Sequence, residues 1–123
     1  MKLGPLWLKI QIACGDALAM GPGKADLLEA IIAEGSISGA GRALGMSYRR
    51  AWLLVDEMNR CFDPVLVETL KGGGRERGAK VSATGLAVLE AYREMEREAA
   101  AIAERSAYAR LREHLRVEPI PTD

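Results

Sequence analysis

The sequence predicts a mainly α-helical fold with one small β-hairpin, and three observations support this prediction. Apolar residues recur at helical spacing in several separate segments of the chain. A glycine-rich basic stretch lies between two short segments that have the composition of strands. The last predicted helix, of roughly 30 residues, would form a rod of roughly 45 Å, longer than a small domain covers. These features together predict a winged helix-turn-helix domain that continues into a long C-terminal dimerisation helix.

The N-terminal part is predicted to begin with a strand. Residues 7–14 place Leu8, Ile10 and Ile12 on one side and polar residues on the other. This alternation is typical of a strand with one solvated face. Residues 15–23 contain three glycines and a proline, which predicts a flexible connection.

The first predicted helix covers residues 24–34 and is interpreted as scaffold. Its apolar residues recur at helical spacing and are expected to face the core. They are Leu27, Leu28, Ile31 and Ile32. Gly35 follows at a position where helices commonly end in a left-handed residue.

The second predicted helix and the turn after it begin a helix-turn-helix. Ser36 or Ser38 can cap this helix. Its packing face is expected to comprise the residues Ala40, Ala43 and Leu44, which are mostly small and would let the next helix approach closely. Gly45 supplies the backbone freedom that a tight turn between two helices needs.

The third helix is predicted over residues 47–61 and ends at Asp63 and Pro64. Its inward-facing residues are expected to be Ala51, Val55, Met58 and Phe62. Its start carries a serine cap, Ser47, followed at once by Tyr48, Arg49 and Arg50. Backbone donors at a helix terminus bind phosphate, and arginine bonds bidentately to guanine edges. This helix start therefore suits the major groove of DNA.

Several side chains of the third helix have alternative interpretations. Arg50 could pair with Asp56 or Glu57 at the surface instead of binding a base, and the Tyr48 hydroxyl could bond the protein's own backbone. Trp52 is expected to pack in the core. Leu53 or Leu54 is expected to be an exposed contact to a second subunit.

A wing is predicted directly after the helix-turn-helix. Residues 65–70 have the composition of a strand, residues 71–80 form a glycine-rich basic loop, and residues 80–83 can form the return strand. The alternative is an ordinary flexible hairpin tip. Basic side chains in such a loop suit phosphate or minor-groove contacts. The complete set of predicted DNA-binding residues is Ser36, Ser38, Ser47, Tyr48, Arg49, Arg50, Arg75, Arg77 and Lys80.

The last helix is predicted over residues 83–116 and carries a heptad seam. The seam residues predicted to mediate dimerisation are Val88, Tyr92, Met95, Ala99 and Ile102. Leu86 and Leu89 lie toward another face and could anchor the helix to the domain. The alternative is a break near Ser106, after which Leu111 and Leu115 fold back onto the domain.

The chain thus divides into three predicted parts. Residues 1–82 form the DNA-binding domain, residues 83–116 form the dimerisation helix, and residues 117–123 form a flexible tail.

Charge and composition are compatible with a folded DNA-binding protein. The chain has 123 residues, of which 49% are hydrophobic and 28% charged, and its formal net charge is zero. Residues 36–80 nevertheless carry eight basic against five acidic residues, a local surplus of three positive charges. Affinity for DNA depends on the phosphates contacted locally, so this asymmetry favours DNA as a partner.

Catalytic, metal and membrane functions find little support in the sequence. Cys14 and Cys61 have no metal-ligand spacing, and His114 is the single histidine, so no enzyme, metal site or cofactor is predicted. Two isolated cysteines are typical of reduced thiols in the cytoplasm. No apolar run reaches the roughly 20 residues of a membrane span, and no signal segment opens the chain. A cytoplasmic location is therefore predicted.

The motifs in this order resemble the N-terminal DNA-binding domain of ModE-type molybdate-responsive transcription regulators, relatives of the LysR winged helices. The resemblance rests on LKIQI, GSIS, GMSYRRAW with DEMN, VLVETLKGGG, and the S-x-T-G-x-x-x-L start of the last helix. It covers residues 7–95, about three-quarters of the chain. It implies a dimeric repressor or activator whose recognition helices read a palindromic operator. Its DNA-reading positions would fall at residues 47–50, and its wing at residues 73–77.

Family members that sense molybdate carry additional C-terminal oxyanion-binding domains, and nothing in this sequence replaces them. Molybdate binding by this polypeptide is therefore not expected. The resemblance still implies a link to molybdenum or to other metal or oxyanion physiology.

The function predicted from the sequence is a sequence-specific DNA-binding transcriptional regulator acting as a homodimer on double-stranded DNA. The alternative is a winged-helix module for protein–protein interaction that does not read DNA, which the neutral net charge and the Leu53–Leu54 pair favour. A third possibility is a redox-responsive regulator that uses Cys14 or Cys61.

Overall fold

The structure is a computed structural model that describes residues 1–70 and 78–122. The helices are α1 (Pro22–Glu34), α2 (Ile37–Ala43), α3 (Tyr48–Cys61), α4 (Ala83–Ala100) and α5 (Ser106–Arg112), with a 3-10 turn at Ala101–Glu104. The strands are β1 (Lys2–Leu3), β2 (Leu6–Trp7), β3 (Ile12–Cys14), β4 (Ala17–Met20), β5 (Val67–Thr69) and β6 (Ala79–Val81). They pair as three antiparallel hairpins, β1–β2, β3–β4 and β5–β6.

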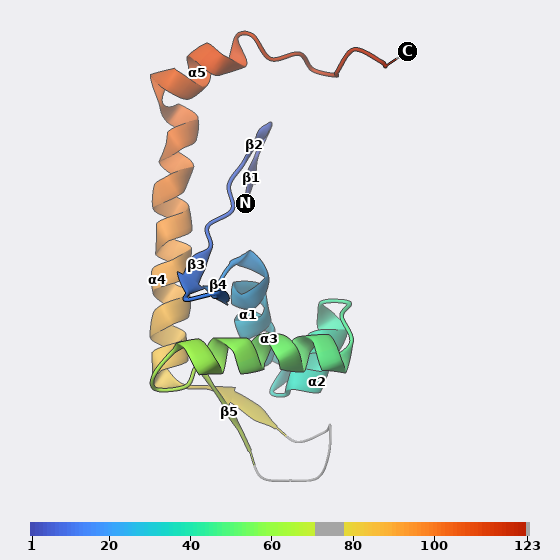
Figure 1. The fold of residues 1–123 in the computed structure, drawn as a ribbon, viewed down its shortest axis with the longest axis vertical. Helices are drawn as coiled ribbons and strands as arrows, with labels where there is room; N and C mark the ends of the chain where they lie inside the picture. The colour runs from blue at the N-terminus through green and yellow to red at the C-terminus, as the bar shows by residue number, and fades with distance from the viewer. Residues whose placement is uncertain (71–77, 123) are drawn as a thin grey trace.

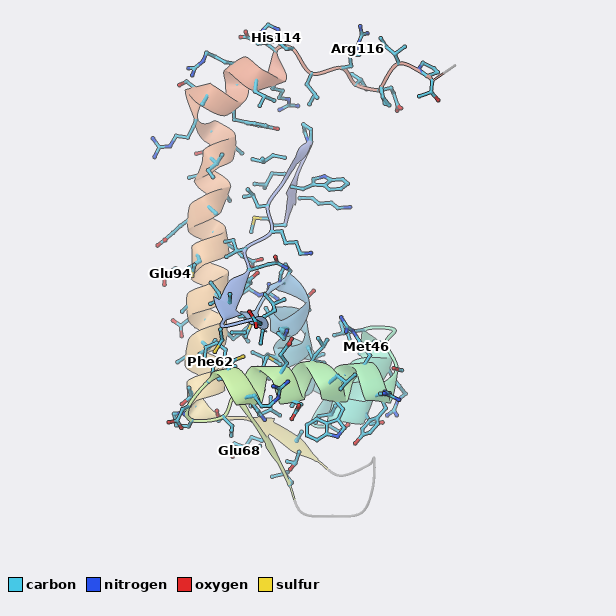
Figure 2. The ribbon with its side chains drawn as sticks, viewed as in Figure 1. Met46, Phe62, Glu68, Glu94, His114 and Arg116 are labelled. Atoms are coloured by element: carbon cyan, nitrogen blue, oxygen red, sulfur yellow. The ribbon has the colours of Figure 1, made fainter. Side chains whose placement is uncertain are left out.

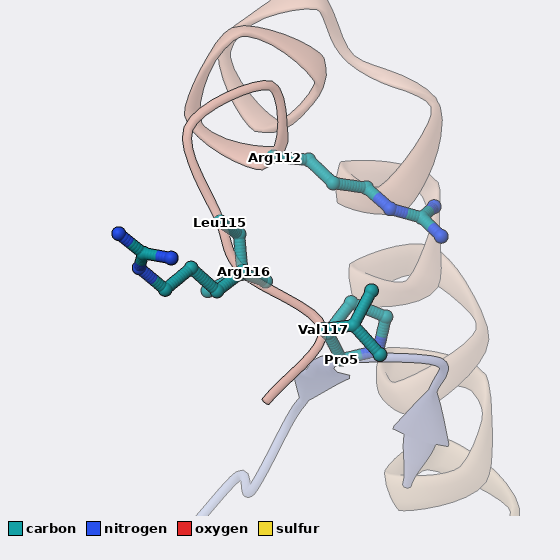
Figure 3. A pocket seen from close by; sticks show the side chains of 5 residues that line it. All are labelled: Pro5, Arg112, Leu115, Arg116 and Val117. Carbon is teal, nitrogen blue, oxygen red and sulfur yellow. The ribbon is translucent and has the colours of Figure 1, made fainter. Parts of the chain in front are cut away.

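Helix α4 is the long axis of the molecule (Figure 1). The helices α1, α2 and α3 and the β5–β6 hairpin gather at one end of α4, and α5 turns away at the other end. The C-terminal segment lies near the β1–β2 turn. Pro5 of this turn lines a shallow hollow together with Arg112 and residues 115–117 (Figure 3). No helix among the described residues is long and apolar enough to cross a membrane.

One hydrophobic core joins all the elements at the helix-turn-helix end. Its fully buried large side chains come from β4, α1, α3 and the segment before β5; they are Met20, Leu27, Leu28, Ile31, Val55, Met58 and Leu66. The predicted core positions of α1 are confirmed except Ile32, which is half exposed. Gly35 ends α1 in the left-handed conformation with φ 75°, as predicted.

The N-terminal expectations need correction. The single strand predicted over residues 7–14 is wrong, because residues 8–11 separate β2 from β3. The predicted flexible connection is also wrong: it contains the turn at Gly15, strand β4 and the first turn of α1. Ala19 and Met20 of β4 are buried, and β4 packs against α3. This burial against a distant helix orders a segment whose glycines had indicated flexibility.

The continuous helix predicted over residues 83–116 is also wrong. Helix α4 begins after its Ser82 cap, and the helical run ends at Glu104. Arg105 has an extended backbone, with φ −86° and ψ 150°, and α5 then starts in a new direction (Figure 1). The alternative of a break near Ser106 is thus correct in position. Leu111 and Leu115, however, stay more than half exposed instead of packing on the domain.

Candidate DNA-binding interface

The turn between α2 and α3 brings the two helices into close contact. Gly45 has φ 70°, a left-handed conformation that glycine adopts readily. A Cβ built on Gly41 would lie 3.3 Å from the Ala51 Cβ and 3.3 Å from the Met46 carbonyl oxygen. The predicted close approach of the two helices is confirmed, but it occurs at Gly41. The predicted packing positions Ala43 and Leu44 are wrong, because both residues are exposed. The buried face of α2 is made instead by Ile37, Ser38, Gly39, Ala40 and Gly41.

The two predicted serine caps of α2 have different positions. Ser36 is the cap, and its Oγ accepts a hydrogen bond from the Gly39 backbone N–H at 2.9 Å. Ser38 is the second residue of α2 and is only 6% exposed. Its Oγ accepts a hydrogen bond from Arg42 Nη1 at 2.8 Å. Ser38 therefore anchors an arginine at the surface of α2 and does not itself present its hydroxyl to solvent.

Helix α3 presents its first turn to solvent. The Ser47 Oγ accepts a hydrogen bond from the Arg50 backbone N–H at 3.0 Å and caps the helix as predicted. Arg49 and Arg50 are exposed, while Tyr48 is partly buried against the core. The predicted inward positions Ala51, Val55 and Met58 are fully buried, and Phe62 is partly buried. The inward strip thus holds the helix on the domain and leaves the arginine side outside.

Charge pairing makes the start of α3 the positive part of this helix. Asp56 pairs with Arg60 at 3.0 Å, and Glu57 pairs with the buried Lys24 of α1 at 2.5 Å. The hydrogen bond from Lys24 holds the pKa of the Glu57 carboxyl below its usual value. Within residues 1–70 and 78–122, no ion pair involves Arg49 or Arg50. The alternative pairing of Arg50 with Asp56 or Glu57 is therefore not what the structure shows.

The apolar residues in the middle of α3 include Trp52, which lies at the surface and not in the core. Trp52 is 42% exposed and Leu53 is 53% exposed, so the core position expected for Trp52 is wrong. Leu54 is partly buried and packs against the core. The physical reason is helical geometry: the buried strip at Ala51 and Val55 leaves the residues just after Ala51 turned outward.

The base of the predicted wing is fixed to α3. Asn59 Nδ2 donates a hydrogen bond to the Val67 carbonyl oxygen at 2.9 Å. Its Oδ1 accepts hydrogen bonds from the backbone N–H groups of Leu66 at 3.0 Å and Val67 at 3.1 Å. Asn59 is not among the residues predicted from the sequence, because an amide near a helix end has no periodic signal. Asn59 couples the position of the hairpin to that of the recognition helix.

The hairpin is also joined to the start of α2. The Ala79 backbone N–H donates a hydrogen bond to the Gly35 carbonyl oxygen at 2.9 Å. Ser36 and Gly78 form an isolated antiparallel β-bridge. Lys80 is exposed on β6, opposite Glu68 on β5. Figure 2 shows Glu68 on the strand that leaves the α3 region. Arg75 and Arg77 fall in residues 71–77, outside the described residues.

A second surface lies where α4 meets β3, β4 and the end of α3. An open apolar hollow of about 260 Å³ is lined by Ile12, Met20, Phe62, Val88, Ala91, Tyr92 and Met95. Figure 2 shows Phe62 at the end of α3 nearest α4. Of the predicted seam, Met95 and Ile102 are more than 40% exposed, and Val88 and Ala99 are partly exposed.

Tyr92, one of the predicted seam residues, is buried and hydrogen-bonded within its own chain. It is 2% exposed, and its hydroxyl donates a hydrogen bond to the Ile10 carbonyl oxygen at 2.7 Å. Burial raises the pKa of this hydroxyl and keeps it protonated as a donor. Tyr92 therefore fastens the N-terminal segment to α4, and its side chain is not available to a second copy.

The described residues include two cysteines and one histidine, which are residue types that can bind metals or act in catalysis. No group of three or more His, Cys, Asp or Glu side chains among them is arranged to hold a metal ion. Burial raises the pKa of the Cys61 thiol, which disfavours the reactive thiolate. His114 follows α5, far from α3 (Figure 2).

Comparison with solved structures defines the class of protein. The full-length regulator LysG of Corynebacterium glutamicum with bound effector Arg is 31% identical, with a TM-score of 0.52, and the match covers 76% of this chain and 30% of that chain. The CbnR DNA-binding domain, solved in a complex with DNA, matches with a TM-score of 0.54 at 23% identity over 71% of this chain and 94% of that chain. The chain has the winged helix-turn-helix fold of the DNA-binding domains of LysR-type regulators.

Sequence relatives define the group more narrowly. The molybdenum-pterin-binding protein MopA of Rhodobacter capsulatus is 35% identical over 92 residues, which is 75% of this chain and 35% of MopA. The DNA-binding transcriptional dual regulator ModE of Escherichia coli K12 is 34% identical over 87 residues, 71% of this chain and 32% of that protein. The molybdenum transport protein ModE of Azotobacter vinelandii is 37% identical over 89 residues, 72% of this chain and 31% of that protein.

This chain is therefore similar in sequence to ModE-type regulators and has a winged helix-turn-helix fold, as the sequence motifs had indicated. The chain spans about a third of the length of the curated relatives that it matches. No family model matches it.

Proposed function

We propose that this chain is a sequence-specific DNA-binding transcriptional regulator that acts as a homodimer. The observation that supports this most directly is the first turn of α3. It is capped by Ser47 and carries Arg49 and Arg50 exposed, next to a hairpin base that Asn59 holds in place. The same fold occurs in a solved complex with DNA.

Roles within the interface follow from chemistry and position. Arg49, with Arg50 as second choice, is proposed to bind a guanine edge, since guanidinium and guanine match bidentately. Ser47 and Tyr48 are proposed to contact phosphates beside the helix start, and Ser36 does the same at the start of α2. Lys80, together with Arg75 and Arg77, supplies affinity that is largely independent of sequence.

The homodimer is proposed to form along α4. The hollow around Phe62, Val88 and Met95 is apolar, and the seam continues along the helix to Ala99 and Ile102. A second copy would cover this continuous apolar surface. Two recognition helices would then enter successive major grooves roughly 34 Å apart, and such a pair reads a palindromic operator. DNA as ligand implies the cytoplasm as the working location.

The regulated process is proposed to concern molybdenum or a related metal or oxyanion. This proposal is supported by the relatives' names, which describe a molybdenum transport protein and a molybdenum-pterin-binding protein. It assigns no effector to the residues of this chain.

The first experiment is selection of bound fragments from sheared source-organism DNA by the purified chain at near-physiological salt. Enrichment of a shared inverted repeat is expected. Affinity for that repeat should fall steeply as salt rises, and an Arg75→Ala, Arg77→Ala double variant should show a shallower salt dependence. Absence of enrichment, together with salt-insensitive binding to a protein partner, would favour the rival protein-interaction module that the exposed Trp52 and Leu53 suggest.

A further inference from the structure

The outer face of α3 changes character along its length. Its start carries the exposed Arg49 and Arg50, its middle carries the exposed apolar side chains Trp52 and Leu53, and its end carries the paired Asp56 and Arg60. Leu53 is 53% exposed, and it lies one helical turn after Arg49 on the same side of the helix. If DNA covers this face, Leu53 is removed from water, and this burial is favourable where the side chain meets an apolar group.

The major groove offers one strong apolar feature, the C5-methyl group of thymine. The rise from residue 49 to residue 53 is about 6 Å along the helix axis. This is close to two base-pair steps of about 3.4 Å each. A helix whose Arg49 reaches a guanine therefore carries Leu53 over a base pair close to that guanine.

We propose that Leu53 is a specificity-determining residue that recognises the methyl group of a thymine within about two base pairs of the guanine bound by Arg49. Trp52, on the neighbouring side of the helix, covers the adjoining sugar and phosphate with its apolar ring. This inference rests on the proposed DNA-binding function and adds to it a required base in each operator half-site.

DNA is favoured over a protein partner at Leu53 by the charges around it. The two arginines next to the apolar pair form no ion pair within the described part of the chain, so a polyanion complements them. The surface proposed for a second copy lies elsewhere, around Phe62 at the far end of the same helix.

The test removes single methyl groups from the operator. In the shortest inverted repeat recovered by selection, each thymine is replaced in turn by deoxyuridine, which differs from thymine only by that methyl group. For the unaltered chain, affinity is expected to fall about fourfold at one position per half-site, equivalent to about 0.8 kcal/mol for one buried methyl group. Leu53→Ala is expected to bind the thymine and deoxyuridine operators equally, and Leu53→Met is expected to retain the discrimination.

A matched control is Leu86→Ala, because Leu86 is a similarly exposed leucine, 49%, on α4. It should retain the full thymine preference. Circular dichroism and thermal unfolding should show all three variants folded, since both leucines are at the surface. The unaltered chain and Leu53→Ala, each measured on the thymine and the deoxyuridine operators, form a double-mutant cycle between one side chain and one methyl group.

The inference is overturned if no deoxyuridine substitution weakens binding, or if Leu53→Ala keeps the unaltered chain's preference for thymine. A variant that keeps this preference but loses self-association would place Leu53 in a protein contact instead. If the unaltered chain binds no DNA sequence selectively, the proposed DNA-binding function itself is wrong. That outcome differs from a failure of the Leu53 inference, because no operator is then recovered by selection.

Discussion

Lys24 and Glu57 illustrate how single residues position the recognition helix. The Lys24 side chain is only 3% exposed, and its ammonium bonds the Glu57 carboxylate of α3. A buried ammonium without a partner is costly, so this ion pair fixes α3 against the start of α1. It also neutralises Glu57, so the exposed Arg49 and Arg50 dominate the charge of the proposed DNA-facing surface.

Replacing Glu57 by Gln should therefore lower the free energy of unfolding by about 1–3 kcal/mol at neutral pH, because Lys24 stays buried and charged. Asp56→Asn is the control. It breaks the neighbouring exposed pair with Arg60 and should cost less than about 1 kcal/mol. Urea unfolding of the three proteins measures both values. Equal losses for the two variants would contradict a special role for the buried lysine.

The same pair predicts a dependence of stability on pH. The pKa of Glu57 is lower in the folded chain than its ordinary value of 4.5. The stabilisation is therefore fully present above the unfolded pKa and is lost as pH falls through the lower folded pKa. The stability gap between the unaltered chain and Glu57→Gln should stay constant near neutral pH and narrow as the pH falls below the ordinary pKa of 4.5. A gap that stayed constant over this range would show that the carboxylate is not the source of the stabilisation.

Arg49 is the residue on which base reading is proposed to depend. Arg49→Ala should reduce affinity for the selected operator by about 1–3 kcal/mol and affinity for a scrambled duplex much less. Fluorescence anisotropy with both duplexes at one salt concentration separates the two effects. Arg112→Ala, which removes an exposed arginine from α5, should leave the ratio unchanged. Unaltered selectivity of Arg49→Ala would remove the base-reading role.

At the scale of elements, the molecule depends on contacts at the ends of helices. The start of α4 is bound to the segment before β5, because Ser82 Oγ donates to the Val65 carbonyl oxygen at 2.6 Å and also caps the Gly85 backbone N–H at 3.0 Å. Farther along α4, Arg93 bonds Asp26 and Glu29 of α1. The hairpin, α1 and α4 are thereby held in one arrangement around α3.

Gly85→Ala tests the tightest of these contacts. A Cβ at residue 85 would lie 2.4 Å from the Leu66 carbonyl oxygen and 2.6 Å from Val81 Cγ1. Since the first neighbour is backbone, the start of α4 must move, and stability should fall by about 1–3 kcal/mol. Gly23→Ala is the matched control, because a Cβ there meets nothing within 4 Å and alanine favours the helix. If Gly85→Ala unfolds at the same midpoint temperature as the unaltered chain, the start of α4 is not tightly packed.

At the scale of the whole molecule, α4 extends beyond the core and carries an apolar surface that the described chain leaves open. Leu89 and Tyr92 anchor the helix to its own domain, whereas Met95 and Ile102 remain exposed. Helix α4 therefore has one face that packs on its own domain and another face that is proposed to contact a second copy.

Met95→Glu should convert the proposed dimer to monomer, because it places a charge in the apolar hollow beside Phe62 and Val88. Light scattering after size exclusion measures the mass. Leu86→Glu places the same charge at an exposed leucine on another face of α4 and should leave the mass unchanged. A monomeric unaltered chain, or an unaffected Met95→Glu variant, would rule out this surface as the dimer contact.

The sequence by itself determined the features that depend on neighbouring residues. These include the serine caps at Ser36 and Ser47, the left-handed glycines at Gly35 and Gly45, and the inward strip of α3. Caps, turns and helical periodicity act within a few residues, so their signals are legible in one chain. The motifs built on them were specific enough to indicate the ModE-type domain.

Features that depend on partners distant in sequence became visible in the folded molecule alone. Strand β4 packs against α3, and Glu57 is neutralised by a lysine 33 residues away. Asn59 finds its hydrogen-bond partners in the backbone of Leu66 and Val67. The outward position of Trp52 and the internal position of Tyr92 depend on which face of each helix the core occupies. Hydropathy alone does not fix that choice, because several faces of these helices carry apolar residues, and packing selects among them.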